Sequence, residues 1–417
     1  MKRLVLLALT LALAATSCIT TERANPIRVG ALYPLSGSQG PGGVDEHRGA
    51  ALAADLVNDD GGVSGRPIEL VSIDVPAADA APAAVQALSE DGVELVLGSY
   101  GSTISSVIAR ATAAEGMVFW ETGAVGMLPD EAARGELTFR MPPTGTVLGR
   151  NAIAFVADRL ARELGRDAHD LRYGVAFVDD VYGRSVAGGA LAELEERGLP
   201  LVGSFGYDAR TADMRELARS IADARIEVLF VSAYLEDGVQ MREALVAEHV
   251  PLVASIGTSS SYCMPQFGDE LGLDAVGLFA SDKPDANALD PAGLAPEAAA
   301  LLGRANDEYG DRWGTDMSAP ALAGFSATWA LLHEVLPSAG AGDVSASAVA
   351  EAAGAIDLPP GSLPNGSGLL FGEPGSVDAG DNIRAAGVIW EWIRPGEHVV
   401  VWPPLFATHP VEALPIR

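Results

Sequence analysis

Cysteine is almost absent from this chain, since only Cys18 and Cys263 occur among its 417 residues. If Cys18 belongs to an export signal, Cys263 has no partner, so we expect no internal disulfide and a fold held by its core alone. Histidine is also scarce: the six histidines are scattered and lack Cys or His neighbours at ligand spacing. The sequence therefore predicts no metal site and no cofactor.

Long hydrophobic runs and basic residues are scarce as well. After the first 15 residues, no apolar run approaches the roughly 20 residues that a membrane-spanning helix needs. Lysine and arginine number 27 against 56 aspartates and glutamates, which gives a formal net charge of −29. Because phosphate binding needs clustered cations, this balance excludes nucleic acid as a partner and indicates solubility or a salty habitat.

The first 18 residues are typical of an export signal. A cationic start, Met1–Arg3, precedes an apolar stretch from Leu4 to Ala15. Ala15-Thr16-Ser17-Cys18 is a small-residue cleavage site that ends in cysteine and resembles a bacterial lipobox. We therefore expect residues 1–18 to be a lipoprotein signal peptide. Cys18 would then be lipidated and would hold the exported protein on a membrane, in the periplasm or at the cell surface. An ordinary signal peptide with an incidental cysteine is the alternative.

Short β-rich runs alternate with helical stretches over the next hundred residues. Strands are expected at 27–32, 68–73, 93–97 and 117–120, and helices at 44–58, 78–89 and 103–114. The Gly-, Ser- and Pro-containing segment 36–43 is expected to be a loop. Four successive β/α units predict a parallel sheet covered by helices on both faces.

The same alternation restarts after a break at 139–143, which we interpret as a crossover between two lobes. Helices are expected at 151–164, 185–197, 214–224 and 238–248, and strands at 172–178, 201–205, 228–232 and 252–256. Beyond these, only helices 296–309 and 319–336 and a strand at 386–393 stand out. The C-terminal part is too short for a further domain and is expected to complete the two lobes.

An enzyme on a nucleotide-binding fold is a competing class. Residues 37–43 are glycine-rich and follow the first strand, but they do not complete the G-x-G-x-x-G spacing and Pro41 interrupts them. No Gly-x-Ser-x-Gly, His-Glu-x-x-His or P-loop signature occurs in the sequence. We therefore expect the protein not to be an enzyme.

Four segments carry a resemblance to a known family: 27–37, 58–70, 91–99 and 180–183. The most specific is Asn-x-x-Gly-Gly-x-x-Gly-Arg at 58–66. The chain resembles the branched-chain amino-acid (Leu/Ile/Val) binding proteins, which are type I periplasmic solute-binding proteins of ABC transporters. The resemblance implies an α/β fold of two doubly wound parallel-sheet lobes, with three crossovers, a hinge and an interlobe cleft. We expect 26–140 plus 284–370 to form lobe 1, and 141–283 plus 371–417 to form lobe 2.

The resemblance also implies ligand contacts in lobe 1. The loop 98–103 opens a helix, whose N-terminus suits a carboxylate, and Ser102 matches the family serine that holds the ligand carboxylate. Tyr100 and Thr103 in the same loop are further candidates. The alternative is that Ser102 and Thr103 only cap the helix. Gly123 and Val125 fall where the family uses backbone groups against the ligand.

In lobe 2 the resemblance implies contacts from Tyr182, Tyr234 and the region of Thr258. Tyrosine suits a closing cleft because it combines an apolar face with a polar tip, although surface packing is the alternative. Near Thr258 the family places an acid against the ligand ammonium, whereas residues 256–261 contain none. A buried ammonium without a partner is costly, so either Glu121, Glu236 or Asp237 replaces this acid, or the ligand is not a plain α-amino acid.

The resemblance thus implies a solute receptor that captures an amino acid or related small carboxylate by hinge closure and delivers it to the permease subunits of an ABC importer. The alternative is a ligand-sensing lipoprotein of the same fold that signals to a membrane receptor.

Overall fold

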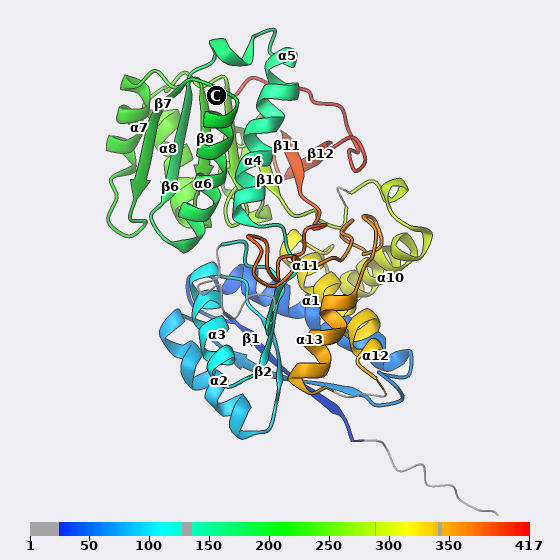
Figure 1. Cartoon of the computed structure of the whole chain (residues 1–417). Coiled ribbons are helices and arrows are strands. Elements are labelled where there is room, and N and C mark those ends of the chain that lie inside the picture. The colour runs from blue at the N-terminus through cyan, green and yellow to red at the C-terminus, as the bar shows by residue number, and fades with distance from the viewer. Residues whose placement is uncertain (1–24, 127–135, 288, 341–343) are drawn as a thin grey trace, which may run out of the picture.

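Two sheets of mostly parallel strands organise the chain, one in each lobe (Figure 1). The computed structural model describes residues 25–126, 136–287, 289–340 and 344–417. The expected lipidation site, Cys18, lies outside these ranges. The fold class is the one predicted: α/β, with two doubly wound lobes.

Lobe 1 is built on a five-stranded parallel sheet in the order β2-β1-β3-β4-β5. Helices α2 and α3 cover one face, while α1, α11 and α13 lie against the other (Figure 1). The strands are β1 (Ile27–Tyr33), β2 (Ile68–Asp74), β3 (Leu95–Gly98), β4 (Val118–Glu121) and β5 (Thr138–Arg140). The helices are α1 (Gly40–Asp59), α2 (Ala81–Glu90), α3 (Ser102–Ala114), α10 (Pro296–Trp313), α11 (Ala319–Trp329), α12 (Leu336–Ser338) and α13 (Ala346–Ala355).

Lobe 2 is built on a seven-stranded sheet in the order β12-β11-β10-β9-β8-β6-β7, in which β11 pairs antiparallel with both β10 and β12 and the other pairs are parallel. Its strands are β6 (Tyr173–Val178), β7 (Leu201–Tyr207), β8 (Val228–Ser232), β9 (Ala254–Thr258), β10 (Phe279–Asp282), β11 (Val388–Arg394) and β12 (Glu397–Trp402). Its helices are α4 (Gly145–Phe155), α5 (Ala161–Glu163), α6 (Val181–Glu196), α7 (Met214–Asp223), α8 (Leu235–Ala247) and α9 (Pro265–Leu271). A π-helical turn, Val156–Leu160, joins α4 to α5.

One expected boundary is wrong, and several elements of the structure were not expected. Helix α1 begins at Gly40, inside the segment expected to be a loop, because Pro41 is tolerated in a first helical turn. The short strands β5, β10 and β12 and the helices α9 and α13 were not expected. β5 and β10, with three and four residues, lack the length that makes a periodic pattern visible.

Glycines fix the C-terminal helices onto lobe 1. A Cβ at Gly49 of α1 would lie 1.9 Å from the Ala321 carbonyl oxygen, and one at Gly324 of α11 would lie 2.1 Å from the Glu46 carbonyl oxygen. The two helix backbones therefore touch at positions where only glycine fits. Through this contact, helix α11, which comes late in the chain, packs onto lobe 1, whose sheet is formed by much earlier residues.

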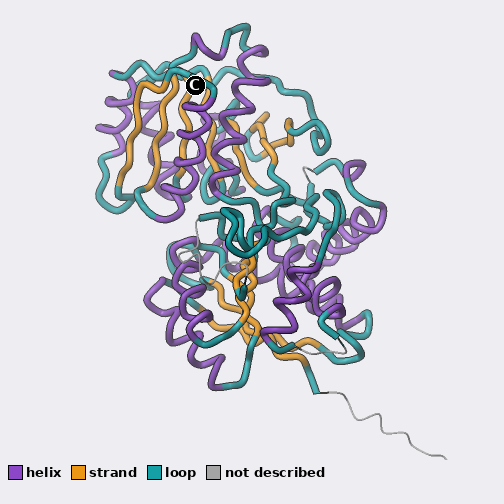
Figure 2. Tube along the Cα trace, viewed as in Figure 1, coloured by secondary structure: helices purple, strands orange, loops and turns teal. Residues whose placement is uncertain are grey.

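The chain passes between the lobes three times, after β5, after β10 and before β11, and loops gather there (Figure 2). Arg140 at the end of β5 forms a buried ion pair with Asp381 in the third passage, at 2.6 Å. Its guanidinium also donates to the carbonyl oxygens of Val125 and Gly126. Arg140 therefore ties two of the passages to the loop after β4. We retain the residue division between the lobes stated above as a proposal.

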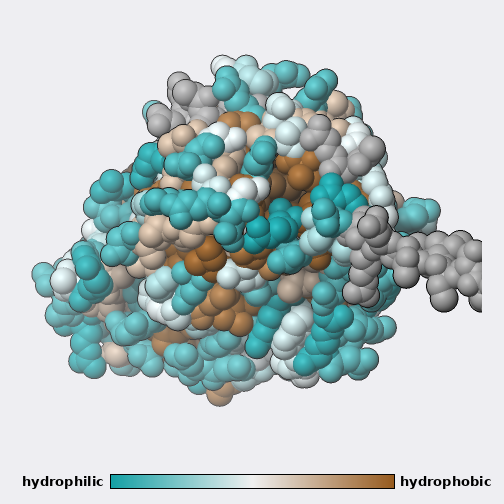
Figure 3. All heavy atoms as spheres, turned by 90° about the horizontal axis from the view of Figure 1, so that it is seen from below, coloured by the Kyte–Doolittle hydropathy of each residue, from teal (hydrophilic) through white to brown (hydrophobic). Residues whose placement is uncertain are grey.

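Seen from below, the lobe 1 end shows hydrophobic residues in its middle, surrounded by hydrophilic ones (Figure 3). The large hydrophobic side chains that are exposed among the described residues come singly from distant parts of the chain: Val147, Leu201, Leu273, Val377, Ile383 and Leu405.

Candidate functional site

Two adjoining chambers lie where the carboxyl ends of the strands of both lobes face each other. The first is lined by Tyr100, Gly101, Ser102, Gly123, Val125, Tyr182, Tyr234, Ser259, Ser260 and Lys283. The second shares Tyr100, Tyr234 and Ser260 and adds Ser38, Gln39, Pro41, Gly42, Leu235 and Met264. We call them the first and second chamber. Ligands of open α/β sheets bind beyond the carboxyl ends of the strands, which is where both chambers lie.

The first chamber contains the N-terminus of α3. Gly101 is the N-cap of this helix, and among the described residues no side chain caps it. The Ser102 hydroxyl accepts a hydrogen bond from the Gly126 amide at 2.9 Å rather than from its own helix. The first-turn amides of α3 and their positive dipole end are thus directed at the chamber. Thr103, the next residue, does not line either chamber.

Glu121 holds the lobe 1 loops in place from behind. One carboxylate oxygen accepts from the Gly123 and Ala124 amides at 2.8 and 2.7 Å. The other accepts from the Ser99 amide at 3.1 Å and from the Ser105 hydroxyl. Burial raises the pKa of Glu121 to about 7, against the effect of these four donors. Its four donors belong to the loops after β3 and β4 and to the first turn of α3, so its role is to position these loops.

Lobe 2 contributes an aromatic wall. The rings of Tyr182 and Tyr234 pack with their centroids 5.3 Å apart. The Tyr182 hydroxyl bonds to the Thr258 hydroxyl at 2.9 Å, and the Tyr234 hydroxyl donates to Asp180 at 2.6 Å. Burial raises the pKa of both phenols, so they remain neutral. Thr258 itself lines neither chamber and acts by orienting Tyr182.

Tyr100 connects the lobes across the site. It follows β3, and its hydroxyl donates to the Ser260 hydroxyl of lobe 2 at 3.4 Å. Its ring lies against Gly42 of α1, where a Cβ would come within 2.3 Å. Tyr100 and Ser260 line both chambers, and their hydrogen bond brings the loops after β3 and β9 into contact.

Comparison with known proteins identifies the family. Residues 26–373 match the model of the periplasmic binding protein family. The chain belongs to the periplasmic binding protein family. The Leu/Ile/Val-binding protein homolog 8 of Brucella abortus (strain 2308) is 31% identical over 281 residues, which are 66% of this chain and 69% of that protein. Homolog 7 from the same strain is 30% identical over 270 residues, 64% of this chain and 67% of that one.

Solved structures share the fold of this periplasmic binding protein. An extracellular ligand-binding receptor from Rhodopseudomonas palustris HaA2 superposes with a TM-score of 0.76 at 17% identity, covering 91% of this chain and all of that one. The branched-chain amino acid transporter substrate binding protein of Streptococcus pneumoniae, in complex with isoleucine, gives 0.72 at 14% identity, with coverage of 91% and 100%. The resemblance inferred from the sequence is thereby confirmed. The protein is an exported solute-binding protein of this family and not an enzyme.

Six of the eight predicted ligand contacts line the first chamber, namely Tyr100, Ser102, Gly123, Val125, Tyr182 and Tyr234. Thr103 and Thr258 do not. Sequence reasoning missed Gly101, Ser259, Ser260 and Lys283. Lys283 carried a signal, since it is the only lysine after Lys2.

None of the three carboxylates considered as a replacement acid lines either chamber of this periplasmic binding protein. Glu121 is occupied by its loops, as described above. Asp237 accepts from the Tyr207 hydroxyl at 2.6 Å and from the Tyr234 amide at 3.1 Å, where it caps α8. Glu236 is exposed and accepts from Gln240 at 3.4 Å. Neither chamber has an aspartate or glutamate among the described residues that line it.

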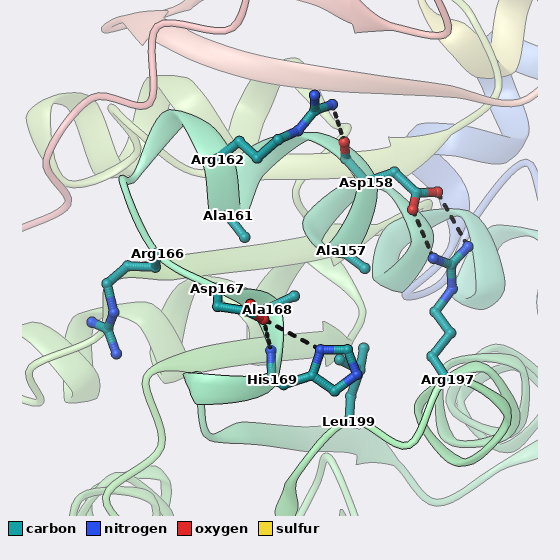
Figure 4. A pocket seen from close by; sticks show the side chains of 10 residues that line it. All are labelled: Ala157, Asp158, Ala161, Arg162, Arg166, Asp167, Ala168, His169, Arg197 and Leu199. Atoms are coloured by element: carbon teal, nitrogen blue, oxygen red, sulfur yellow. Dashed lines mark hydrogen bonds and ion pairs between the residues drawn. The ribbon is translucent and has the colours of Figure 1, made fainter.

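A larger and more open hollow, about 840 Å³, lies in lobe 2 only, between the end of α4, α5 and the end of α6 (Figure 4). Two of its arginines are already paired with carboxylates. Arg197 binds both carboxylate oxygens of Asp158 at 2.7 and 3.1 Å. Arg166 binds Glu227 at 3.1 Å, and Figure 4 shows its side chain turned away from the hollow. Despite its size, this hollow lacks groups from a second lobe and offers no argument for a ligand.

Two further expectations concern metals and membranes. The described ranges contain no group of three His, Cys, Asp or Glu residues that would share a metal ion. Within the same ranges, no helix has both the length and the apolar character to cross a membrane.

Proposed function

We propose that this protein is the solute receptor of an ABC importer and holds an amino acid or a related small carboxylate in the first chamber. The observation that carries the proposal is that Tyr100, Ser102 and Gly123 of lobe 1 meet Tyr182 and Tyr234 of lobe 2 around one space. The names of several relatives and structural neighbours support it, because they are Leu/Ile/Val-binding protein homologues or branched-chain amino acid transporter proteins.

The carboxylate of the solute occupies the N-terminus of α3. Backbone amides and the helix dipole favour an anion there, and the Ser102 hydroxyl adds a donor once its proton is turned to the ligand. The Gly126 amide, which donates to the Ser102 oxygen, leaves that hydroxyl proton available.

Capture proceeds by hinge closure. The three passages between the lobes are the elements that flex, and the Tyr100–Ser260 hydrogen bond forms when the lobes approach. A ligand that contacts both lobes stabilises the closed arrangement in proportion to its preference for it. The closed form is what permease subunits would recognise.

The protein is attached to a membrane through lipid on Cys18. The small residues before this cysteine support the assignment. Mass spectrometry of the N-terminal peptide, from wild type and Cys18→Ala, tests it: lipid mass on the wild type only is expected, and an unmodified wild-type peptide contradicts it. Solute uptake in cells that lack the protein separates transport from sensing, because a pure sensor leaves uptake unchanged.

A thermal-shift screen with small carboxylates and amino acids tests solute binding. A ligand at a hundred times its Kd stabilises the native state by about 2.7 kcal/mol. Ser102→Ala removes a hydrogen bond to a charged group, worth about 1.5–3 kcal/mol, so we expect affinity to fall about 10- to 100-fold. Thr103→Ala, one residue further and outside the chamber, is the matched control and should bind as wild type does. Equal affinity of Ser102→Ala and wild type would refute the carboxylate seat.

A further inference from the structure

Lys283 stands at the first chamber and directly follows β10, where the chain leaves lobe 2. The residue is only 3% exposed, and its ammonium donates to the Gly123 carbonyl oxygen of lobe 1 at 2.9 Å. It also lies 6.0 Å from the centre of the Tyr100 ring. Lysine occurs in the sequence only at positions 2 and 283. Lys283 is therefore the only lysine after the expected signal peptide.

Of the acidic groups near Lys283, Asp282 and Glu46 line neither chamber. Asp282 accepts from the Ser259 hydroxyl at 2.7 Å. Glu46 lies behind the loop after β4, where it accepts from the Thr122 hydroxyl at 2.6 Å. Burial raises the pKa of Glu46 to about 8 even though Lys283 favours its ionised form, so most of it is neutral at pH 7. A buried cation therefore faces a chamber whose described lining contains no carboxylate.

We propose that the Lys283 ammonium binds the anionic group of the ligand, and that the ligand is a small carboxylate without an α-ammonium group, of the 2-oxo or 2-hydroxy acid class. This inference rests on the proposed function and narrows its ligand class. One carboxylate is held between the α3 N-terminus with Ser102 and the Lys283 side chain, and the apolar body packs on Tyr182 and Tyr234.

An α-amino acid is disfavoured by two features of the same site. Its ammonium would find no carboxylate among the described residues of either chamber. The Gly123 carbonyl oxygen, an acceptor at the chamber, already accepts a hydrogen bond from the Lys283 ammonium. The two ammonium groups would therefore compete for one acceptor at close range, whereas an oxo or hydroxy group adds no positive charge.

The test compares ligands that differ only at the α-carbon. Isothermal titration of the mature protein uses three sets: leucine, 4-methyl-2-oxopentanoate and 2-hydroxy-4-methylpentanoate; alanine, pyruvate and lactate; phenylalanine, phenylpyruvate and phenyllactate. In the set that fits the chamber, we expect the oxo and hydroxy acids to bind at least tenfold more tightly than the amino acid. The hydroxy acid is included because it cannot form an imine with a lysine.

Lys283→Met keeps the unbranched chain as far as the ε position and removes the ammonium group with its charge. We expect it to weaken the oxo and hydroxy acids at least 30-fold while leaving the amino acid unchanged or tighter, so that the discrimination disappears. Arg219→Met removes one exposed positive charge on α7, where Arg219 pairs with Glu248, and serves as the matched control with affinities within twofold of wild type. The ratio of affinities for the oxo or hydroxy acid and the amino acid is measured on the wild-type protein. This ratio therefore still tests the ligand class if Lys283→Met does not fold.

The outcomes separate this inference from the proposed function. Tighter binding of the amino acid in the fitting set, lost in Ser102→Ala but kept in Lys283→Met, overturns the inference and leaves the proposed function standing. Absence of binding by every member of the three sets at 1 mM, a concentration on the order of the weakest useful affinity, rejects both.

Discussion

Replacing Glu121 should loosen the ligand loops without removing a ligand contact. Its two carboxylate oxygens join the loop after β3, through Ser99, to the loop after β4, through Gly123 and Ala124. These loops carry Tyr100, Ser102, Gly123 and Val125. Two substitutions separate the contributions of the two carboxylate oxygens. Glu121→Gln keeps one acceptor oxygen, whereas Glu121→Leu removes both.

The magnitudes follow from the amides left without an acceptor. In Glu121→Gln the oxygen facing Gly123 and Ala124 remains, and the amide NH₂ faces the Ser99 N–H, so one buried donor is orphaned at about 1–3 kcal/mol. In Glu121→Leu the Ser99 and Gly123 amides lose their acceptor, whereas the Ala124 amide keeps the Ser99 carbonyl oxygen at 3.1 Å. We therefore expect a loss of about 3–5 kcal/mol, at the upper end for a single substitution. The comparison belongs at pH 6, because burial raises the pKa of Glu121 to about 7 and keeps most of the wild-type carboxyl neutral there.

Urea unfolding followed by tryptophan fluorescence measures these losses, since Trp120 is buried beside Glu121. Glu236→Gln, at an exposed position of α8, is the matched control. Its free energy of unfolding should stay within about 0.5 kcal/mol of that of the wild type. Ligand affinity should fall in the same order as stability. If Glu121 instead faced a ligand ammonium, both variants would lose affinity for amino acids with unchanged stability, and that result would refute the positioning role.

Two further substitutions test buried charges near the site. Glu46 has its pKa raised from 4.5 to about 8, so it stabilises the fold fully below pH 4.5 and loses this contribution as the pH rises to 8. Glu46→Gln should therefore become more stable relative to wild type as the pH rises across that range. The gain is at most roughly 5 kcal/mol, at about 1.4 kcal/mol per pH unit. Urea unfolding at several pH values measures it, and curves of stability against pH that run parallel for the two proteins would contradict it. Arg140→Met should cost about 3–5 kcal/mol because it breaks the buried pair with Asp381, and Arg140→Met/Asp381→Leu should recover part of it in the same assay; no recovery would show that the pair is not the cause.

The sequence pattern was sufficient for the lobes and for most of the chamber. Alternating β-rich and helical runs predict strands whose carboxyl ends meet at one edge, and this places Ser102, Gly123, Tyr182 and Tyr234 on neighbouring loops. Ser102, Tyr182 and Tyr234 stand at the start of helices of 13 to 16 residues, where boundary errors of one or two residues do little harm.

The remaining contacts depend on tertiary packing that the sequence does not display. Whether Glu121 faces a ligand or its own loop depends on where the Ser99 amide lies, 22 positions earlier in the chain. Lys283 follows the four-residue strand β10, which lies between β9 and β11 and has no pattern of its own. The sequence shows that lysine is scarce, but it does not show that the Lys283 side chain points toward Gly123.

The acidic surface and the cationic chamber act over different ranges. Most of the net charge of −29 belongs to exposed carboxylates, whose effect beyond about 8–10 Å is screened at physiological salt. The Lys283 ammonium and the α3 N-terminus are buried, where screening is weak and interactions are strong. The equilibrium affinity for an anion is therefore set by these few local groups, while the distant negative charge mainly slows the approach of the ligand. For the same reason the net charge of this chain carries no information about the sign of its ligand.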